Sequence, residues 1–493
     1  MTKPGKEKSA HFEHRGMSLD LRAQVMSLES ILEFIEEMRS FKMNVLLIEW
    51  EATFPFSKHS TICNQSAYTP KEVTSILSAC KAAGIEVIPI QQCFGHVEYI
   101  LMHLRYAGLR ENDRNFSQVC PLKADESIEV FEEIFEELFE FHDSPYIHIG
   151  GDETRLLGTC EECASVVESE GKAKLYTDYL LRLIEMVKRL GKRPIIWADI
   201  LLTHPDLIDQ LPRDLILIDW NYGWDVKKFG DTKDLINLGF EVWGATAMRS
   251  APDNHSKTCW MRHFNNLKDF IPFARETGYS GMIQTSWSTS GEYGYLMDSE
   301  GVASKILPIR RVYPQAGFRI LIQAFADSVD SAEALAPQPF VERYGAERFG
   351  LNQSDSRSLA RLLGETGDQE NAAVATPEQA DEWMDALRQI SPESHQGEFA
   401  HIALIVRMSI QGIKVSRVYE QFQLLATDLK RINAISGTVG RLLQEAQIID
   451  KDFRRLNQHS LSGHELDEEK SYREVLLLEL SNRIEHLKER FSQ

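Results

Sequence analysis

Two adjacent carboxylates, Asp152 and Glu153, end the segment Ser144-Pro-Tyr-Ile-His-Ile-Gly-Gly-Asp-Glu-Thr154. Residues 146–149 have the composition of a short strand, and the two glycines that follow allow the chain to turn so that both carboxyls reach one pocket. Two crowded carboxyls do not both ionise easily, so we expect one of them to hold its proton near neutral pH. A proton donor beside a fixed anion is what cleavage of a glycosidic bond requires. The alternative is that both acids only stabilise the start of a helix.

Eight short β-rich runs alternate with amphipathic helical stretches from residue 15 to about residue 310. Most runs are almost continuously apolar, which is typical of strands buried on both faces of a parallel sheet. Eight such units predict an α/β fold, a (β/α)8 TIM barrel, with a doubly wound open sheet as the alternative. The runs span residues 17–21, 44–50, 86–91, 146–149, 194–200, 215–220, 240–247 and 281–287.

The chain changes character after about residue 330. We expect a catalytic barrel over residues 1–330 and a mostly α-helical C-terminal region over residues 331–493, with residues 351–377 irregular or linking. Two apolar stripes with heptad-like spacing, over residues 415–449 and 477–491, predict two long helices joined through residues 457–467. Packing against the barrel or against each other is the main interpretation of these stripes, and a homodimer interface is the alternative.

Side chains at the carboxyl ends of barrel strands carry out the chemistry of such enzymes. Aromatic faces stack on the apolar faces of sugar rings and exclude water from the reacting centre. We therefore expect the tryptophans in or after the predicted strands to converge on one rim and form a sugar pocket. They are Trp50, Trp197, Trp220, Trp243 and Trp287.

Composition narrows the function further. The 493 residues carry a formal charge of −20 without a basic cluster, which argues against a nucleic-acid partner. No apolar run has membrane-spanning length and the polar N-terminus does not resemble a signal peptide, so we expect a cytoplasmic protein that does not bind membranes. Seven cysteines argue against a disulfide framework. Cys160 and Cys163 form a lone CxxC, which we interpret as two reduced thiols, so that no metal and no cofactor is expected.

The segment from His148 to Glu153 resembles the HxGGDE signature of family 20 glycoside hydrolases, the β-N-acetylhexosaminidases. The likeness covers residues 12–310 and is most similar to the hexosaminidase D branch. Further elements match in the same order along the chain. They are Arg15-Gly-Met-Ser-Leu-Asp20, Lys42-Met-Asn44, Tyr68-Thr-Pro-Lys-Glu72, Gly84-Ile-Glu-Val-Ile-Pro89, Gly95-His96 and Cys120-Pro-Leu122.

The resemblance implies an exo-acting enzyme that removes terminal β-linked N-acetylhexosamine from oligosaccharides or glycoconjugates. Glu153 would be the general acid and base, and Asp152 would orient the substrate's acetamido group, whose oxygen is the nucleophile. Tyr222 would bind that oxygen. The remaining expected substrate-site residues are Arg15 for ring hydroxyls, His96 and His148, which we expect to position loops, Trp197, Trp220 and Trp287 as walls, and Glu292.

Two departures from the family pattern concern the outer sugar hydroxyls. The second strand leads into Glu49-Trp-Glu51 instead of an Asp-rich turn, and Trp287 is followed by Ser288 and Thr289 before the next acid, Glu292. Three alternatives stay open: a conventional retaining glycosidase with Glu49 or Glu51 as nucleophile, a metal site made by His148, Asp152 and Glu153, and a sugar-binding barrel without turnover.

Overall fold

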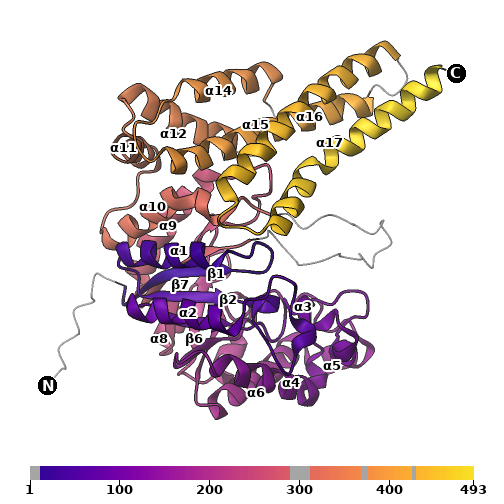
Figure 1. The fold of residues 1–493 in the computed structure, drawn as a ribbon. Helices are drawn as coiled ribbons and strands as arrows, with labels where there is room; N and C mark the ends of the chain where they lie inside the picture. The colour runs from indigo at the N-terminus through magenta and orange to yellow at the C-terminus, as the bar shows by residue number, and fades with distance from the viewer. Residues whose placement is uncertain (1–11, 289–310, 368–374, 425–428, 493) are drawn as a thin grey trace. The chain divides into compact units, whose positions relative to one another are not determined.

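Eight parallel strands close into a barrel in the computed structural model, which describes residues 12–288, 311–367, 375–424 and 429–492 (Figure 1). Neighbouring strands in the chain are neighbours in the barrel, and β1 pairs with β8 to close it. The predicted barrel is therefore confirmed. The strands are β1 His14–Asp20, β2 Val45–Glu49, β3 Glu86–Ile90, β4 Tyr146–His148, β5 Arg193–Trp197, β6 Ile216–Trp220, β7 Glu241–Arg249 and β8 Gly281–Ser286.

Apolar side chains fill the inside of the barrel. All five residues of β2 are buried, as expected for a strand with side chains on its inner face and helices over its outer face. Branched and aromatic residues from alternate positions form the interior core. Its members include Val45, Leu47, Ile88, Ile90, Ile195, Ile216, Ile218 and Ile283.

Helices connect the strands, and their ends follow local sequence signals. Thr69 accepts a hydrogen bond from the backbone of Glu72 while the Glu72 side chain returns to the backbone of Thr69, and Pro70 occupies the first turn. The helices of this region are α1 Leu28–Ser40, α2 Pro70–Ala82, α3 Glu98–Leu101, α4 Ala124–Phe139, α5 Glu161–Glu170, α6 Lys172–Arg189, α7 Asp199–Thr203, α8 Lys233–Asn237 and α9 Trp260–Thr277.

The C-terminal region is helical, as predicted, but the expectation of an irregular stretch over residues 351–377 is wrong for most of its length. Leu359, Leu362 and Leu363 give an otherwise polar stretch one narrow buried face, which is sufficient for α12. The helices are α10 Arg319–Asp330, α11 Pro337–Phe349, α12 Gln353–Gly367, α14 Pro377–Gln389, α15 Gln396–Leu424, α16 Leu429–Asn457 and α17 Gly463–Ser492.

The two apolar stripes lie on three helices instead of two. The first stripe is divided between α15 and α16, and the second lies on α17 (Figure 1). Val418, Ile435 and Leu480 represent the three helices in one shared apolar core. The Gln411 side chain of α15 donates a hydrogen bond to the carbonyl oxygen of Leu442 on α16 (3.1 Å). The stripes therefore pack against each other, which was the main interpretation of the pattern.

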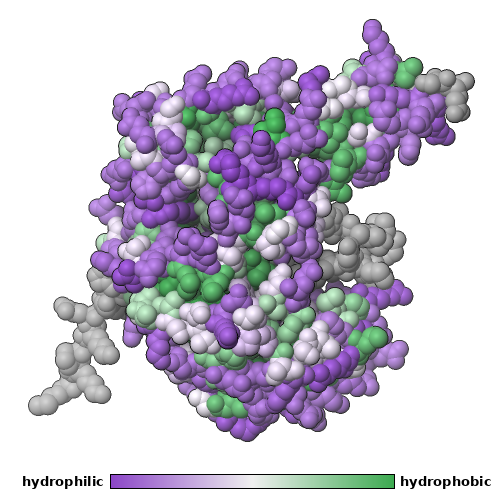
Figure 2. Space-filling model, viewed as in Figure 1, coloured by the Kyte–Doolittle hydropathy of each residue, from purple (hydrophilic) through white to green (hydrophobic). Residues whose placement is uncertain are grey.

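The chain divides into two compact units. One comprises Met1–Met248, Asn266–Ile309 and Phe325–Ala334 and contains the barrel strands, apart from the last residue of β7. The other comprises Arg249–Asn265, Arg310–Ala324 and Leu335–Gln493. The simpler division at residue 330 stays a prediction. Hydrophilic side chains cover most of the face in Figure 2. Among the described residues, we find no helix with the length and apolarity to cross a membrane.

We predict that Gly16→Ala prevents normal closure of the barrel. A Cβ atom at Gly16 would lie 1.8 Å from the carbonyl oxygen of Val45, which is backbone of the adjacent strand and has little freedom to move. The expected cost is at least about 1–3 kcal/mol, measured as a fall in the free energy of unfolding. Gly108→Ala is the matched control, since a Cβ there meets no atom within 4 Å. Equal stability of both variants would contradict this packing.

Candidate active site

A tight turn after β4 presents Asp152 and Glu153. Gly150 and Gly151 adopt positive φ angles of 77° and 97°, and Glu153 itself has a φ of 46°. The positive φ of Gly150 favours glycine there, and a Cβ would also displace the Gln92 side chain, whose Oε1 would lie 1.9 Å away. The Tyr176 hydroxyl donates to the carbonyl oxygen of Gly151 (2.7 Å) and holds the turn. The structure thus supports the predicted reason for the glycine pair.

His96 lies against both carboxylates. Its Nε2 is 3.3 Å from Oδ2 of Asp152 and 3.5 Å from Oε2 of Glu153. Gly95 permits this approach, because a Cβ at that position would be 2.8 Å from the carbonyl oxygen of Asp152. The side chains of His96, Asp152 and Glu153 are 13%, 15% and 30% exposed, so the group is largely shielded but reachable from solvent.

The shared contacts decide where the proton resides. Burial lowers the pKa of His96, but Asp152 and Glu153 outweigh it and raise that pKa well above its usual value. Burial raises the pKa of Glu153, but the hydrogen bond and charge of His96, together with Arg155, lower it to about 2. We expected one of the two acids to hold its proton near neutral pH. Without substrate, Glu153 is ionised and does not meet this expectation. The proton resides on the imidazole, 3.5 Å from that carboxylate.

A second charged cluster lies where β1 and β2 end. Arg22 donates from Nε to Asp20 (3.1 Å) and lies 3.8 Å from Glu51. Its guanidinium also lies over the ring of Trp287, 5.4 Å from the centroid. Ser288 donates from its backbone and its hydroxyl to Asp20, at 2.8 Å each. These contacts connect the ends of β1, β2 and β8.

The charged groups of this cluster differ in how burial and their neighbours shift their pKa values. Burial lowers the pKa of Arg22, but Asp20, Glu49 and Glu51 outweigh it, so the guanidinium stays charged. Burial raises the pKa of Glu49 to about 7 and that of Glu51 well above its usual value. Arg22 is not among the residues predicted from the sequence to bind the sugar. Its position two residues after Asp20, beyond the end of the first strand, was the signal.

Three of the five predicted tryptophans line the candidate site. Trp197 and Trp287 have ring centroids 6.1 Å apart, and Trp197 also contacts His148 (4.4 Å). Trp220 donates from Nε1 to Asp199 (3.2 Å). Tyr222 is buried beside Trp220, with ring centroids 5.0 Å apart. Burial raises the pKa of the Tyr222 hydroxyl, and the nearby charges of Asp152 and Glu153 add to the rise.

Trp50 and Trp243 do not join this rim, so the predicted convergence of five tryptophans is wrong. Trp50 is buried against Phe54 and Tyr68 and donates from Nε1 to His142 (3.0 Å). Trp243 is buried in the barrel core and stacks on His14, the first residue of β1 (4.5 Å). Both rings are packing residues, because the Trp50 ring turns to Phe54, Tyr68 and His142 although it directly follows β2, and Trp243 lies near the amino end of β7.

Arg15 is also far from the predicted position. It is the second residue of β1, and its Nη1 pairs with Oδ1 of Asp330 (2.5 Å). The direction of the strand places Arg15 at the amino end of the barrel, whereas Asp20 and Arg22 are at the carboxyl end. A role for Arg15 in binding ring hydroxyls is therefore incorrect. Glu292, the other predicted contact for outer hydroxyls, lies outside the described residues.

His148 supports the turn from below. It is fully buried, its Nδ1 accepts the backbone N–H of Gly150 (3.0 Å), and burial lowers its pKa to about 3. A neutral ring that accepts at Nδ1 carries its hydrogen on Nε2. His148 therefore holds the glycine turn, and within the described part of the chain it belongs to no group of side chains spaced to hold a metal ion.

Asp199 adds a third acid to the site. Burial, together with the charge of Asp152, raises the pKa of Asp199 to about 7 although the Trp220 hydrogen bond opposes the rise. The predicted fifth strand, residues 194–200, extends over Asp199, whereas β5 ends at Trp197 and Asp199 is the first residue of α7. Its effect here is electrostatic, because it shares the buried environment of Asp152 and fixes the Trp220 ring.

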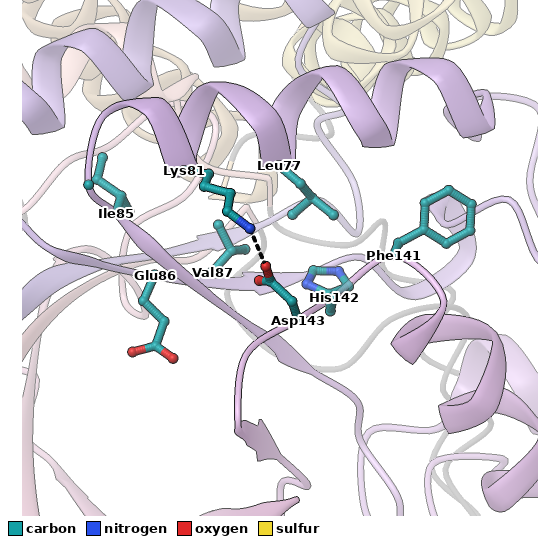
Figure 3. A pocket seen from close by; sticks show the side chains of 9 residues that line it. Leu77, Lys81, Ile85, Glu86, Val87, Phe141, His142 and Asp143 are labelled. Atoms are coloured by element: carbon teal, nitrogen blue, oxygen red, sulfur yellow. Dashed lines mark hydrogen bonds and ion pairs between the residues drawn. The ribbon is translucent and has the colours of Figure 1, made fainter.

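A cavity of ≈ 300 Å³ lies elsewhere on the barrel (Figure 3). Its lining includes Ile85, Glu86 and Val87, which come from the start of β3, and the Lys81–Asp143 ion pair (2.7 Å) spans it. The cavity is at the amino end of the strands, opposite to Asp152 and Glu153. We therefore do not assign the reaction to it.

The fold and the site define a (β/α)8-barrel enzyme with a histidine-bound acid pair and tryptophan walls at the carboxyl ends of its strands. Residues 12–243 match the family described as "Glycosyl hydrolase family 20, catalytic domain". This match covers a little under half of the 493 residues and identifies that part of the chain as a glycoside hydrolase catalytic domain.

Curated relatives agree with this assignment. Hexosaminidase D of Bos taurus is 28% identical over 303 residues, which cover 58% of this chain and 87% of the relative. Hexosaminidase D of Homo sapiens is 27% identical over 311 residues, covering 59% of this chain and 63% of the relative. A chitobiase of Flavobacterium johnsoniae shares the fold, with a TM-score of 0.52 at 15% identity, over 97% of this chain and 75% of its own.

We predict that His96→Asn moves the basic limb of the pH profile of kcat/KM to lower pH. In the native site the shared proton is lost only at the raised pKa of His96, whereas in the variant it is lost at the carboxyl pKa of Glu153. Asparagine tolerates the positive φ of 54° at this position. An unchanged basic limb in the variant would contradict a proton shared between His96 and Glu153.

Proposed function

We propose that the chain is an exo-acting β-N-acetylhexosaminidase that removes terminal β-linked GlcNAc or GalNAc from oligosaccharides or glycoconjugates with retention of configuration. The family 20 domain and the relatives named Hexosaminidase D support this proposal. In this proposal one sugar residue binds between Trp197, Trp287 and the acid pair.

The proposal rests mainly on the different surroundings of the two carboxylate oxygens of Asp152. One oxygen, Oδ2, faces His96 at 3.3 Å, while the other, Oδ1, is buried with no hydrogen-bond partner among the described residues. A buried carboxylate oxygen without a partner is costly, and an amide N–H from a ligand would satisfy it. The substrate's 2-acetamido group supplies such a donor next to the anomeric carbon.

The reaction proceeds in two steps in this proposal. The proton held between His96 and Glu153 passes through Glu153 to the glycosidic oxygen, while the acetamido oxygen attacks the anomeric carbon and the alcohol departs. Asp152 stabilises the positive charge of the oxazolinium and Tyr222 donates to its oxygen. Glu153, now ionised, removes a proton from water, which attacks the same face from which the alcohol left, so the sugar is released with its configuration retained.

Substrate binding falls to Arg22 in place of Arg15. Within the described residues, the ion pairs of Arg22 use its Nε. Its terminal amino groups are the remaining donors for sugar hydroxyls. Burial raises the pKa of Glu51 well above its usual value, and its carboxyl group offers a further contact for sugar hydroxyls.

The geometry disfavours the alternative in which Glu49 or Glu51 is a nucleophile. Both side chains are almost fully buried, and both have raised pKa values, whereas a nucleophile must be ionised and open to the anomeric carbon. Glu49 also accepts a hydrogen bond from Gln92 (3.1 Å). A barrel that binds sugar without turnover is the remaining alternative, and the experiment below separates it.

A panel of aryl β-glycosides that differ only at C2 and C4 tests the proposal. We predict turnover of the two 2-acetamido sugars and a loss of at least about 10²-fold in kcat when a hydroxyl replaces the acetamido group, because the nucleophile is then absent. Turnover of plain glucosides or galactosides at similar rates would instead support an enzymatic nucleophile. Binding without turnover of any member would support the sugar-binding alternative.

Two variants serve as controls for this panel. Glu153→Gln should lower kcat by about 10²–10⁴-fold on every substrate that is cleaved, since it removes general acid and base action. Asp152→Asn should lower kcat and also reduce the preference for the acetamido sugars. Near-native rates in either variant would remove that residue from the assignment.

We predict that Arg22→Lys lowers kcat/KM by about 10- to 150-fold, because a hydrogen bond to a charged group contributes about 1.5–3 kcal/mol. Lysine keeps the charge within the acidic cluster but loses the planar set of donors. Arg15→Lys is the control and should leave kcat/KM unchanged, since it keeps the charge that pairs with Asp330 and lies at the opposite end of β1. A larger loss of kcat/KM in Arg15→Lys than in Arg22→Lys would instead indicate that Arg15 binds the sugar.

The cytoplasmic location and a homodimer through the C-terminal helices stay predictions from the sequence. α17 leaves Val475, Leu476 and Leu478 exposed, at 48%, 38% and 48%, next to the face it packs against α16. These side chains are where a second chain would bind if a dimer forms.

A further inference from the structure

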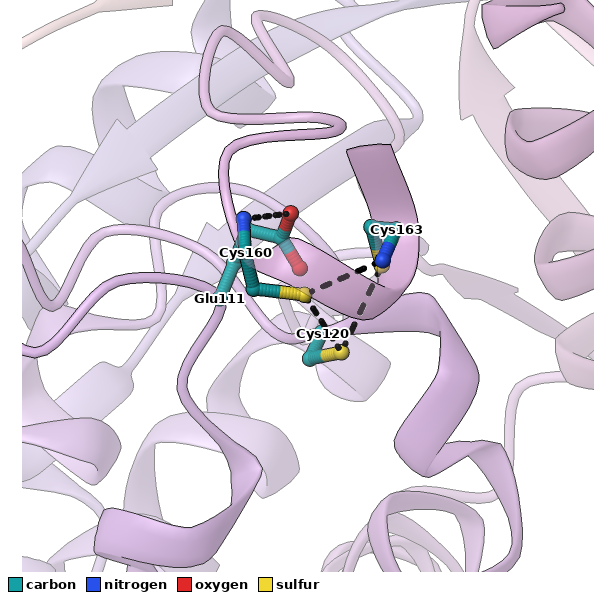
Figure 4. A group of neighbouring side chains, drawn as sticks. All are labelled: Glu111, Cys120, Cys160 and Cys163. Carbon is teal, nitrogen blue, oxygen red and sulfur yellow. Dashed lines mark hydrogen bonds between the residues drawn. The ribbon is translucent and has the colours of Figure 1, made fainter. Parts of the chain in front are cut away.

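Three cysteines and one glutamate converge beside the loop that carries the acid pair (Figure 4). Cys160 and Cys163 form the CxxC at the start of α5, Cys120 comes from the segment before α4, and Glu111 lies nine residues before Cys120. Their ligand atoms all lie within 4.8 Å of one another. We call these four residues the thiol cluster.

The sulfur spacing matches a tetrahedral metal site. Sγ of Cys120 is 3.9 Å from Sγ of Cys160 and 3.6 Å from Sγ of Cys163. Zinc–sulfur bonds of about 2.3 Å in a tetrahedron place neighbouring sulfurs about 3.8 Å apart. A disulfide would need about 2.05 Å, so no pair of the three is bonded, and one sulfur of three would be left over in any case.

Glu111 supplies the fourth possible metal ligand of the thiol cluster. Its surroundings are evidence for a bound cation that is independent of the sulfur spacing. Its Oε1 accepts backbone N–H groups from Gly158, Thr159 and Cys160, at 3.1, 2.8 and 3.1 Å. Its Oε2 is buried on a side chain that is only 2% exposed, and the groups it faces among the described residues are the thiols of the cluster. A buried carboxylate oxygen without a partner is costly unless a cation or a donor satisfies it.

The CxxC geometry also favours bound metal. Cys160 is the residue before the first turn of α5, and its sulfur accepts the backbone N–H of Cys163 (3.3 Å). This contact holds the Cys160 sulfur within 4.8 Å of the other three ligand atoms. We propose that the thiol cluster binds one zinc ion through the sulfurs of Cys120, Cys160 and Cys163 and Oε2 of Glu111.

The bound ion would fix the two loops that form the reacting centre. Cys160 follows Glu153 by seven residues, whereas Glu111 and Cys120 belong to the segment that begins at β3 and carries His96. Gln118 of that segment already accepts the backbone N–H of Leu156 through Oε1 (2.9 Å). Zinc would add a cross-link between the segment of His96 and the segment of Asp152 and Glu153. The site is closed by four protein ligands, so its role is structural.

The sequence alone did not indicate this site, because only one CxxC is visible in it. The other two ligands are 40 and 49 residues before Cys160, and nothing in their spacing marks them as partners. The barrel brings them together by placing the loops after β3 and β4 side by side.

The test is the metal content and the cobalt spectrum of the full-length protein. We predict about one zinc ion per chain after purification in zinc-containing buffer and exhaustive dialysis, and less than about a tenth of that in Cys160→Ser. Cobalt added to the metal-free protein should give the intense visible bands of a tetrahedral ion and a thiolate-to-cobalt charge-transfer band. Glu111→Gln keeps an acceptor at Oε1, so it should retain the fold but weaken zinc binding by more than about tenfold.

Cys80→Ser is the matched control, since Cys80 is a buried cysteine of α2 outside the thiol cluster, and it should bind zinc like the native chain. If Cys160→Ser does not fold, the native chain alone still decides through its zinc content and cobalt spectrum. Protein without zinc, a disulfide between Cys120 and Cys163, or an octahedral cobalt spectrum would each overturn the proposal. The sugar panel above is a separate readout, so failure of one proposal leaves the other standing.

Discussion

A single imidazole between two carboxylates is the interaction on which the rest of the site depends. His96 is 3.3 Å from Asp152 and 3.5 Å from Glu153, and its charge is what allows two adjacent acids to occupy one shielded turn. It also stores the proton, since Glu153 has a pKa of about 2 in its presence while the pKa of His96 is raised. The acid pair is therefore better described as a triad of His96, Asp152 and Glu153. His96 holds the proton, and the neighbouring Glu153 donates it in the proposed reaction.

Backbone geometry makes this triad accessible to a sugar. His96 and Glu153 both adopt positive φ angles, at 54° and 46°, which are uncommon for residues with a Cβ and are held by surrounding contacts. Gly95, Gly150 and Gly151 provide the close approaches that these conformations need. In the proposed site Trp197 and Trp287 are the side walls, and Arg22 supplies donors for the sugar hydroxyls. Each of these groups lies at the end or just beyond the end of a barrel strand, where neighbouring loops converge.

Much of this arrangement could be predicted from the sequence. Apolar runs identified all eight strands, because strands buried on both faces carry a strong and simple signal, and the Gly-Gly-Asp-Glu turn identified the acids. The predictions that were wrong concerned residues whose position depends on the direction of a strand or on contacts between distant parts of the chain. Arg15 and Arg22 both flank the first strand, and only the strand's orientation decides which arginine reaches the site. Trp243 and Trp197 both lie in apolar runs that predict strands, yet Trp243 is in the barrel core beside His14. The thiol cluster needs residues from two loops that sequence spacing does not connect.

A crystal structure of the protein with a thiazoline mimic of the oxazolinium tests the central claim most directly. The account predicts the ligand between Trp197 and Trp287, with its ring nitrogen within hydrogen-bond distance of Oδ1 of Asp152 and Glu153 at the anomeric carbon on the side of the departing alcohol. A ligand bound away from Asp152, or a sugar found covalently attached to Glu49 or Glu51 in a trapped substrate complex, would contradict it.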